Sequence, residues 1–133
     1  MAKILEKDIQ SAVLQYLKLC RYFVWKQSTV GIMKPNGSYI PSSMPGVADI
    51  IGVSPWGQFV AVEVKRPGGK ASPYQLEFLK NVEAAGGLAC IVYSVDDMKH
   101  EIKKWRDQQS PSGKDRDRMK RDLHTETTVQ GRA

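Results

Sequence analysis

The chain has 133 residues, of which 41% are hydrophobic and 26% charged, as in a single globular domain. Its 20 Lys and Arg against 14 Asp and Glu give a formal charge of +6, which favours a polyanionic partner such as nucleic acid. The two cysteines and two histidines form no ligand cluster, which argues against a zinc site. No apolar run approaches the ~20 residues of a membrane span, so we expect a soluble, cytoplasmic protein.

The first half of the chain reads as one helix followed by strands. Apolar residues at helical spacing predict a helix over 4–20, and "YFVWKQS" (22–28) is typical of a short strand. Residues 29–46 hold three Pro and three Gly, and form either an irregular loop or a small hairpin that turns at Asn36-Gly37. Two apolar strands follow, joined by the turn sequence "SPWGQ" (54–58).

The second half of the chain contains residues that typically begin and end helices. "SPYQLEFLKNVEAAGG" (72–87) predicts a helix, with Ser72 as N-cap, Pro73 in the first helical position and Gly86 as the stop. A buried strand is expected at 88–94, and a last helix at 95–106 with its cap at Ser94.

From Asp107 onward the apolar pattern stops, and six Lys and Arg accompany five Asp and Glu. We therefore predict a folded domain over 1–106 and a polar, flexible tail over 107–133. The tail contributes a net +1, so +5 of the total charge belongs to the folded part. The expected order of elements, α-β-β-β-α-β-α, indicates an α/β fold with a central sheet flanked by helices.

Charged residues interrupt the two strands around the turn. Whether the register puts Asp49 opposite Val62 or Glu63, antiparallel pairing brings the two carboxylates into one neighbourhood, because facing side chains lie ~5 Å apart. Strand alternation places Lys65 on the same face as Glu63. The end of this hairpin is therefore expected to gather two carboxylates and one amine.

Burying this group of charges is costly unless they are paired or bound to a metal. One interpretation is an Asp/Glu–Lys cluster that neutralises itself at the solvent end of the sheet. The other is a divalent cation such as Mg²⁺, which takes one or two carboxylates and leaves its other positions to water and phosphate oxygens. With Lys65 beside it and a basic surface around it, the second interpretation points to phosphodiester hydrolysis.

The arrangement Asp49…Glu63-Val64-Lys65 resembles the PD-(D/E)XK nuclease superfamily. A fuller set of blocks resembles the virus-type replication-repair nuclease (VRR-NUC) domain: Glu6 with Ile9-Gln10, "VWKQS", "GVADIIG", "EVKRPGG" and "SPYQ". The resemblance covers about residues 4–98. Ala48 stands where the superfamily pattern has Pro before the aspartate, a backbone position that supplies no ligand.

The resemblance implies a restriction-endonuclease-like core with a mixed sheet, and Mg²⁺ or Mn²⁺ as cofactor. It implies that Asp49 and Glu63 are metal ligands, with the backbone carbonyl of Val64 as a third. It implies that Lys65 is the catalytic lysine. Glu6 matches a first-helix glutamate that lies beside the metal, often through water, although a carboxylate there also suits the positive end of a helix dipole.

Gln75 has two interpretations. It occupies the third helical position after Ser72 and can complete a capping box, and the family carries a glutamine here close to the active site. We include Gln75 and Glu6 among the candidate catalytic residues.

Candidate DNA-binding residues flank these blocks. Gln27 and Ser28 close the first strand and face either DNA or the metal, unless they form an ordinary strand end. The cations Lys26, Lys34, Arg66 and Lys70 are either phosphate contacts or solvated side chains. Trp25, Tyr39 and Trp56 could stack on bases, form a subunit contact or simply pack.

The resulting hypothesis is a metal-dependent DNA endonuclease that is structure-specific and cuts branched DNA such as four-way junctions. The resemblance suggests a replication, recombination, DNA repair or packaging role in a phage or bacterium, and symmetric cutting suggests a homodimer. Alternatives are a sequence-specific restriction-type enzyme with the same chemistry, and a DNA-binding module without catalysis. A small-molecule phosphate substrate or cofactor is not expected, because "RPGGK" (66–70) lacks the pattern of a nucleotide-binding loop.

Overall fold

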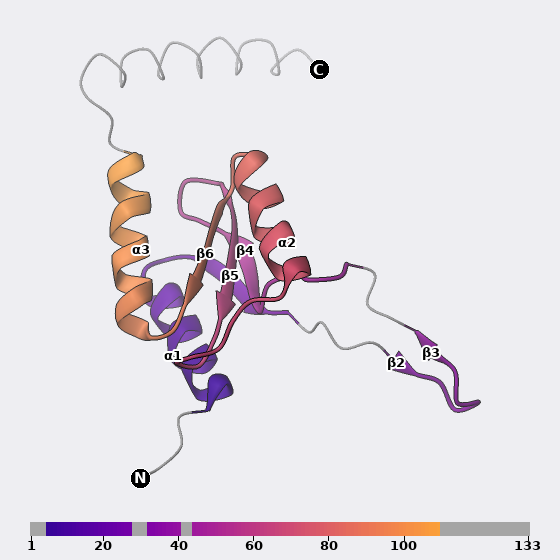
Figure 1. Cartoon of the computed structure of the whole chain (residues 1–133). Coiled ribbons are helices and arrows are strands. Elements are labelled where there is room, and N and C mark those ends of the chain that lie inside the picture. The colour runs from indigo at the N-terminus through magenta and orange to yellow at the C-terminus, as the bar shows by residue number, and fades with distance from the viewer. Residues whose placement is uncertain (1–4, 28–31, 41–43, 110–133) are drawn as a thin grey trace, which may run out of the picture. The chain divides into compact units, whose positions relative to one another are not determined.

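The computed structural model describes residues 5–27, 32–40 and 44–109 (Figure 1). Its elements in chain order are α1 (Glu6–Leu19), β1 (Phe23–Lys26), β2 (Ile32–Met33), β3 (Tyr39–Ile40), β4 (Ile50–Val53), β5 (Phe59–Val64), α2 (Pro73–Ala84), β6 (Leu88–Val92) and α3 (Val95–Gln108). Each helix and strand predicted from the sequence is present, and the predicted ends differ from the observed ones by three residues at most.

The central sheet has the strand order β1-β4-β5-β6. β4 pairs antiparallel with both β1 and β5, whereas β6 runs parallel to β5 after the crossover through α2. The mixed sheet and its α-β-β-β-α-β-α order confirm the predicted fold class. Strands β2 and β3 pair with each other in a separate two-stranded sheet, with Gly37 at φ +87° in the turn, so the hairpin interpretation of this loop is correct.

The register resolves the choice left open by the turn sequence. Val53 pairs with Phe59 and Ile50 with Val62, and the same register continued by one residue sets Asp49 opposite Glu63. Combined with the β1–β4 register, it arranges side chains of one sheet face in three rows. The first row is Phe23–Val53–Phe59, the second is Trp25–Ile51–Ala61, and the third, just beyond the ends of β1 and β4, is Gln27–Asp49–Glu63.

Small side chains let α2 pack closely on the sheet face that carries these three rows. Ala48, Ala61 and Ala89 are buried together with Leu79 of α2, and Phe78, Val82, Ile51 and Ile91 pack around them. α2 contacts β5 and β6. The β1 side of the face keeps large exposed side chains, namely Phe23, Trp25 and Val53.

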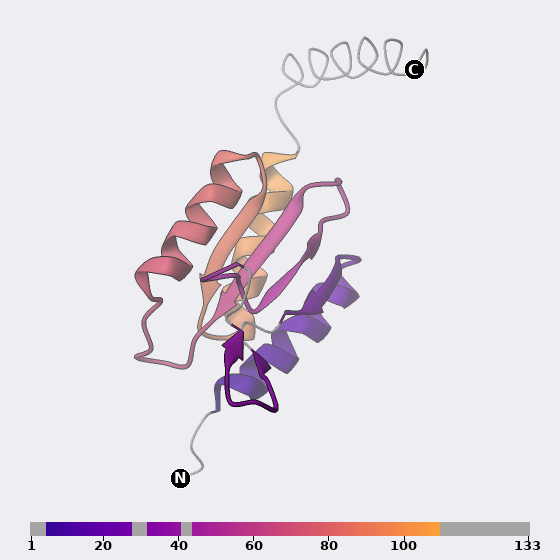
Figure 2. The same cartoon turned by 90° about the vertical axis from the view of Figure 1, so that its right-hand side faces the viewer.

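The opposite face is a continuous layer of buried valines and isoleucine. Val60, Val62 and Val64 of β5 and Ile50 of β4 are fully buried there, and α1, which supplies the buried Val13 and Leu17, contacts β1 and β5. Figures 1 and 2 show α1 and α2 on opposite sides of the sheet. Strand β5 is thus covered on both faces, as its apolar run predicts.

The chain divides into two compact units, Met1–Glu101 and Ile102–Ala133. The first contains the sheet, α1, α2 and the start of α3. Of the second, the structure describes Ile102–Gln109, in which Ile102 and Trp105 are buried. α3 extends to Gln108, two residues beyond the predicted end, and the predicted tail lies almost wholly outside the described residues. Within the described ranges, no helix has the length and apolarity needed to cross a membrane.

Candidate active site

The third row brings the predicted carboxylates together at one end of the sheet. Asp49 immediately precedes β4, and Glu63 is the penultimate residue of β5. The segment before Asp49 is held against the first turn of α2, because Gly46, at φ +78°, lies so near the Tyr74 carbonyl that a Cβ would collide with it. This close approach places Asp49, Glu63 and the N-terminus of α2 around one point.

Asp49 is fixed by bonds to both neighbouring strands. Its backbone carbonyl accepts a hydrogen bond from the Gln27 N–H at 2.7 Å, and its side-chain Oδ2 accepts one from the Val64 N–H at 2.8 Å. The carboxylate therefore cannot rotate freely, and it stays beside Glu63. These bonds also place Val64, a proposed carbonyl ligand, next to the acid pair.

Glu63 is the most buried acidic side chain of the site, with 1% of its surface exposed. Its Oε1 accepts a hydrogen bond from Gln75 Nε2 at 2.9 Å and lies 3.7 Å from Lys65 Nζ. Its Oε2 is buried and receives no hydrogen bond from the residues that the structure describes. A buried carboxylate is costly in its charged form when one of its oxygens receives no hydrogen bond.

The electrostatic environment of Glu63 raises its pKa from 4.5 to about 8. Burial is the largest cause, followed by a side-chain hydrogen bond with Asp49 and by the negative charge of Asp49. Lys65 opposes this increase in pKa, and Glu6 adds a smaller upward contribution. Two carboxyl groups can share a hydrogen bond only when one carries a proton, so this acid pair is satisfied by either a proton or a cation.

These properties fit a hard divalent cation. The site offers carboxylate oxygens, one of which is buried without a donor, and Mg²⁺ prefers oxygen ligands. In the described parts of the chain, no three His, Cys, Asp or Glu side chains gather closely enough to hold a metal by themselves. A cation at the Asp49–Glu63 pair would complete its shell with a backbone carbonyl, water and substrate oxygens, as Mg²⁺ commonly does.

Lys65 follows β5 and keeps its amine at the acid pair. Its side chain is 14% exposed, and Nζ lies within ion-pair distance of Glu63. The predicted proximity of these two residues is therefore confirmed. A largely buried ammonium at this place can stabilise negative charge that develops on a substrate phosphate.

Gln75 takes part in both arrangements that the sequence left open. Ser72 Oγ accepts from the Gln75 N–H at 3.2 Å, and Gln75 Oε1 accepts from the Ser72 N–H at 2.8 Å, which completes the capping box. Because a backbone N–H can only donate, this bond fixes the amide orientation and leaves Nε2 to donate to Glu63. The helix cap and the site thus share one side chain.

The remaining predicted residues lie at several places around the sheet. Glu6 is the first residue of α1 and half-buried, and its charge acts on Glu63. Lys26, Arg66 and Lys70 are exposed on β1 and in the β5–α2 loop, and Lys34 is exposed in the β2–β3 turn. Gln27 Oε1 accepts a bond from Trp25 Nε1 at 3.3 Å. Ser28 lies outside the described residues.

Comparison with solved structures identifies this architecture. One structure described as "VRR_NUC domain" superposes with a TM-score of 0.54 at 22% identity, covering 74% of this chain and 94% of that chain. A second, "VRR_NUC domain protein", gives 0.56 at 16% identity, with coverage of 78% and 89%. The chain has the fold of a VRR-NUC domain. No protein-family model matches the sequence, and no curated protein matches it.

In this fold, described residues from four of the predicted blocks meet at one end of the sheet, namely Gln27, Asp49, Glu63, Lys65 and Gln75. Sequence reasoning did not single out Phe59, Phe78 or Asn81, which line a cavity on the same face. From the sequence, both phenylalanines are expected to be ordinary core residues. Only the packing of α2 against β5 shows that a space remains between them.

Proposed function

We propose that this chain is a divalent-metal-dependent DNA endonuclease. The observation that carries the proposal is the pairing of Asp49 with the buried Glu63, which has one oxygen lacking a hydrogen bond from the described residues and Lys65 at 3.7 Å. The VRR-NUC fold and the basic charge of the chain support a nucleic-acid substrate. The pair sits at the sheet end where the N-terminus of α2 and the exposed Arg66 and Lys70 also lie.

The side chains have separate tasks in this proposal. Asp49 and Glu63 would hold Mg²⁺ or Mn²⁺, with the Val64 carbonyl as a further ligand and Glu6 acting through water. The bound cation would activate a water molecule and offset charge on the scissile phosphate. Lys65 would stabilise the negative charge of the transition state. Gln75 would hold the Glu63 carboxylate in place.

Branched DNA is the proposed substrate, with four-way junctions as one example. The domain is short and offers few elements that could read a long base sequence, so readout of DNA structure is favoured over sequence. Symmetric cutting of a junction needs two active sites, and we propose a homodimer for that reason.

The test compares cleavage of a labelled four-way junction, a flap and a linear duplex in Mg²⁺, Mn²⁺ or EDTA. Glu63→Gln keeps the size and the hydrogen bond from Gln75 but removes the charge, so we expect cleavage to be abolished while DNA binding is kept. Glu83→Gln, an exposed acid on α2, is the matched control and should cut normally.

Each outcome has a distinct meaning. Metal-dependent cutting of the junction by wild type, absent in Glu63→Gln, supports both the chemistry and the branched substrate. Cutting of linear duplex at defined sequences would retain the chemistry and indicate a restriction-type enzyme. Binding without cutting in either metal would contradict catalysis and indicate a DNA-binding module.

A further inference from the structure

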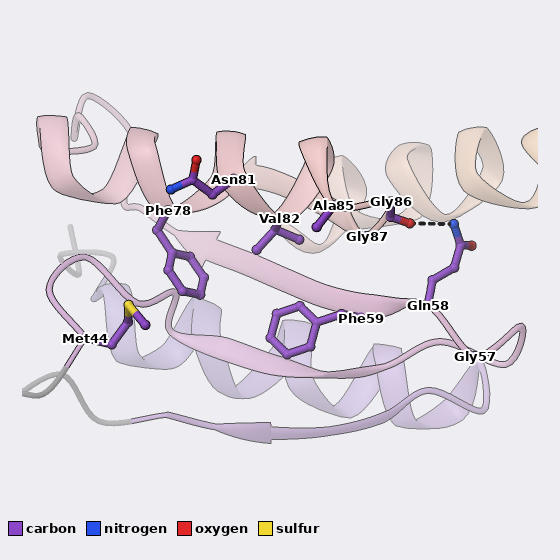
Figure 3. A pocket seen from close by; sticks show the side chains of 10 residues that line it. All are labelled: Met44, Gly57, Gln58, Phe59, Phe78, Asn81, Val82, Ala85, Gly86 and Gly87. Carbon is purple, nitrogen blue, oxygen red and sulfur yellow. Dashed lines mark hydrogen bonds between the residues drawn. The ribbon is translucent and has the colours of Figure 1, made fainter.

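A cavity of about 490 Å³ lies between β5 and α2, on the sheet face that carries the acid pair (Figure 3). Phe59 of β5, Phe78 and Val82 of α2, and Met44 form its apolar walls. None of the described lining residues is charged. Its volume lies within the range of ~300–1,000 Å³ found for small-molecule sites.

Two aromatic rings face this cavity from different elements. Figure 3 shows the rings of Phe59 and Phe78 projecting into the same space, one from the strand and one from the helix. Phe59 keeps 42% of its surface exposed, although its neighbours on β5 are buried. Exposed aromatic rings in a cavity offer flat faces on which a planar aromatic ligand can stack.

Amide groups add polar contacts at the rim. The Asn81 side chain is exposed there, and side-chain amides form paired hydrogen bonds with the edges of nucleobases. Gln58 also lines the cavity, with its Nε2 donating to the Gly86 carbonyl at 3.2 Å. A ligand with aromatic faces and hydrogen-bonding edges therefore suits the site, which is the chemistry of a nucleobase.

The cavity and the candidate active site lie along the same two elements, β5 and α2. Phe78 follows Gln75 by three residues, so the two side chains share one face of α2, and Gln75 binds Glu63. On β5, Phe59 and Glu63 share one face and are four residues apart, which is about 13 Å along a strand. A nucleic-acid strand with a phosphate at Glu63 can therefore direct a nearby base towards the cavity.

We propose that this cavity binds an unpaired nucleobase of the DNA strand whose backbone lies at the Asp49–Glu63 pair. The proposal rests on the proposed nuclease function and names the feature of branched DNA that the protein detects. A base in a duplex must first leave its stack and its partner, whereas an unpaired base near a branch is already free to enter. Stacking on Phe59 and Phe78 tolerates any base, so this contact selects an unpaired base over a paired one and does not depend on sequence.

The experiment measures binding of the full chain in EDTA, so that no cleavage is required. The probes are a dye-labelled duplex, the same duplex with a single-stranded flap, and a flap with abasic residues next to the branch. We expect wild type to prefer the flap over the duplex by about tenfold, as one stacked base contributes. The abasic flap should lose this preference.

Phe59→Ala should lose the same preference, and the abasic flap should then make no further difference. Phe23→Ala is the matched control, since Phe23 occupies the same row of the sheet, is 72% exposed and does not line the cavity. Full preference for the flap in Phe59→Ala, or an equal loss in Phe23→Ala, would overturn the proposal.

A second variant tests the cavity independently, in case Phe59→Ala fails to fold. Ala85→Trp adds a large side chain at an exposed lining position and fills the cavity without removing any packed group. It should abolish the flap preference at an unchanged unfolding midpoint. Retained preference in this variant would overturn the proposal.

Two further measurements separate this proposal from its rivals. Sedimentation tests whether a second copy of the chain occupies the cavity: a dimer dissociated by Phe59→Ala, with flap preference unchanged, would overturn the nucleobase site. Cleavage in Mg²⁺ tests the proposed function separately. If no DNA is cut but the base-dependent preference holds in EDTA, the nuclease proposal fails and the binding site stands.

Discussion

At the residue scale, the carboxylate of Glu63 is costly to bury, and the neighbouring residues of the site offset part of that cost. Its carboxylate is buried at the end of a strand that is otherwise apolar, next to Asp49 and with only one oxygen bonded to Gln75. Lys65 offsets part of the charge, yet the pKa of Glu63 remains raised to about 8. Such strain in a fold is common where a group is kept for its chemistry, because a hydrophobic residue would stabilise the sheet better.

The first prediction at this scale concerns stability and pH in EDTA. The folded-state pKa of Glu63, about 8, lies above the unfolded value near 4.5, so the folded protein retains a proton that the unfolded chain has lost. The stability contributed by protonated Glu63 is complete below pH 4.5 and is lost as pH rises through 8. Denaturant midpoints measured from pH 4.5 to 8.5 should therefore fall for wild type.

Glu63→Gln stays neutral at every pH, so its midpoint should be nearly flat over this range and exceed that of wild type at pH 8. Added Mg²⁺ at pH 8 should stabilise wild type but not the variant, because the cation replaces the proton between the carboxylates. The same downward slope in Glu63→Gln would assign the pH dependence to other groups.

The second prediction concerns Lys65. Lys65→Ala should lower turnover of a cut DNA by about a hundredfold, the usual effect of removing a charge-stabilising donor, while DNA binding persists. Single-turnover cleavage at saturating protein measures this. Lys80→Ala removes an exposed cation of α2 and serves as the control. Normal turnover in Lys65→Ala would remove this residue from the mechanism.

At the element scale, α2 links stability to the site. Its N-terminal capping box and its contact with Glu63 share the side chain of Gln75, and the alanines of the sheet allow the helix to pack closely. Any shift in the start of α2 is therefore transmitted to the carboxylate. The sequence predicted the cap and the site role as competing interpretations, because spacing alone does not show where the second end of an amide points.

A pair of variants separates the two roles. Ser72→Ala removes the side-chain half of the cap and should lower the free energy of unfolding by about 1 kcal/mol with cleavage retained. Gln75→Ala should lower stability similarly and also reduce cleavage, because Glu63 Oε1 loses the hydrogen bond from Gln75 Nε2. Thermal melts and cleavage rates of both variants provide the test. Equal activity of the two would restrict Gln75 to capping.

At the scale of the whole molecule, the two faces of the sheet differ in role. The face covered by α1 supports the fold, and the face covered by α2 carries the candidate site. The α1 face is a continuous apolar layer, whereas the α2 face carries the acid pair, the cavity and the exposed Phe23 and Trp25. The acid pair and the cavity thus share one face, and β5 contributes a residue to each; this strand is held between β4 and β6 and resists displacement.

The last prediction concerns the end of the chain. Mixed charges without apolar periodicity predict that residues after Gln109 add nothing to the core, so truncation there should leave the unfolding midpoint unchanged. Circular dichroism melts of the truncated and full chains measure this, and a truncated protein that fails to fold would contradict the predicted tail.

The sequence by itself determined the elements, the fold class and the approach of Asp49 to Glu63, because these depend on local periodicity, helix caps and a short turn. It left two registers for the hairpin and two roles for Gln75, and gave no indication of the cavity. Tertiary structure decided these points. The pairing of β1 with β4, the parallel pairing of β6 and the depth of α2 against the alanines are contacts between distant segments. Such contacts are set by packing, which local patterns do not specify.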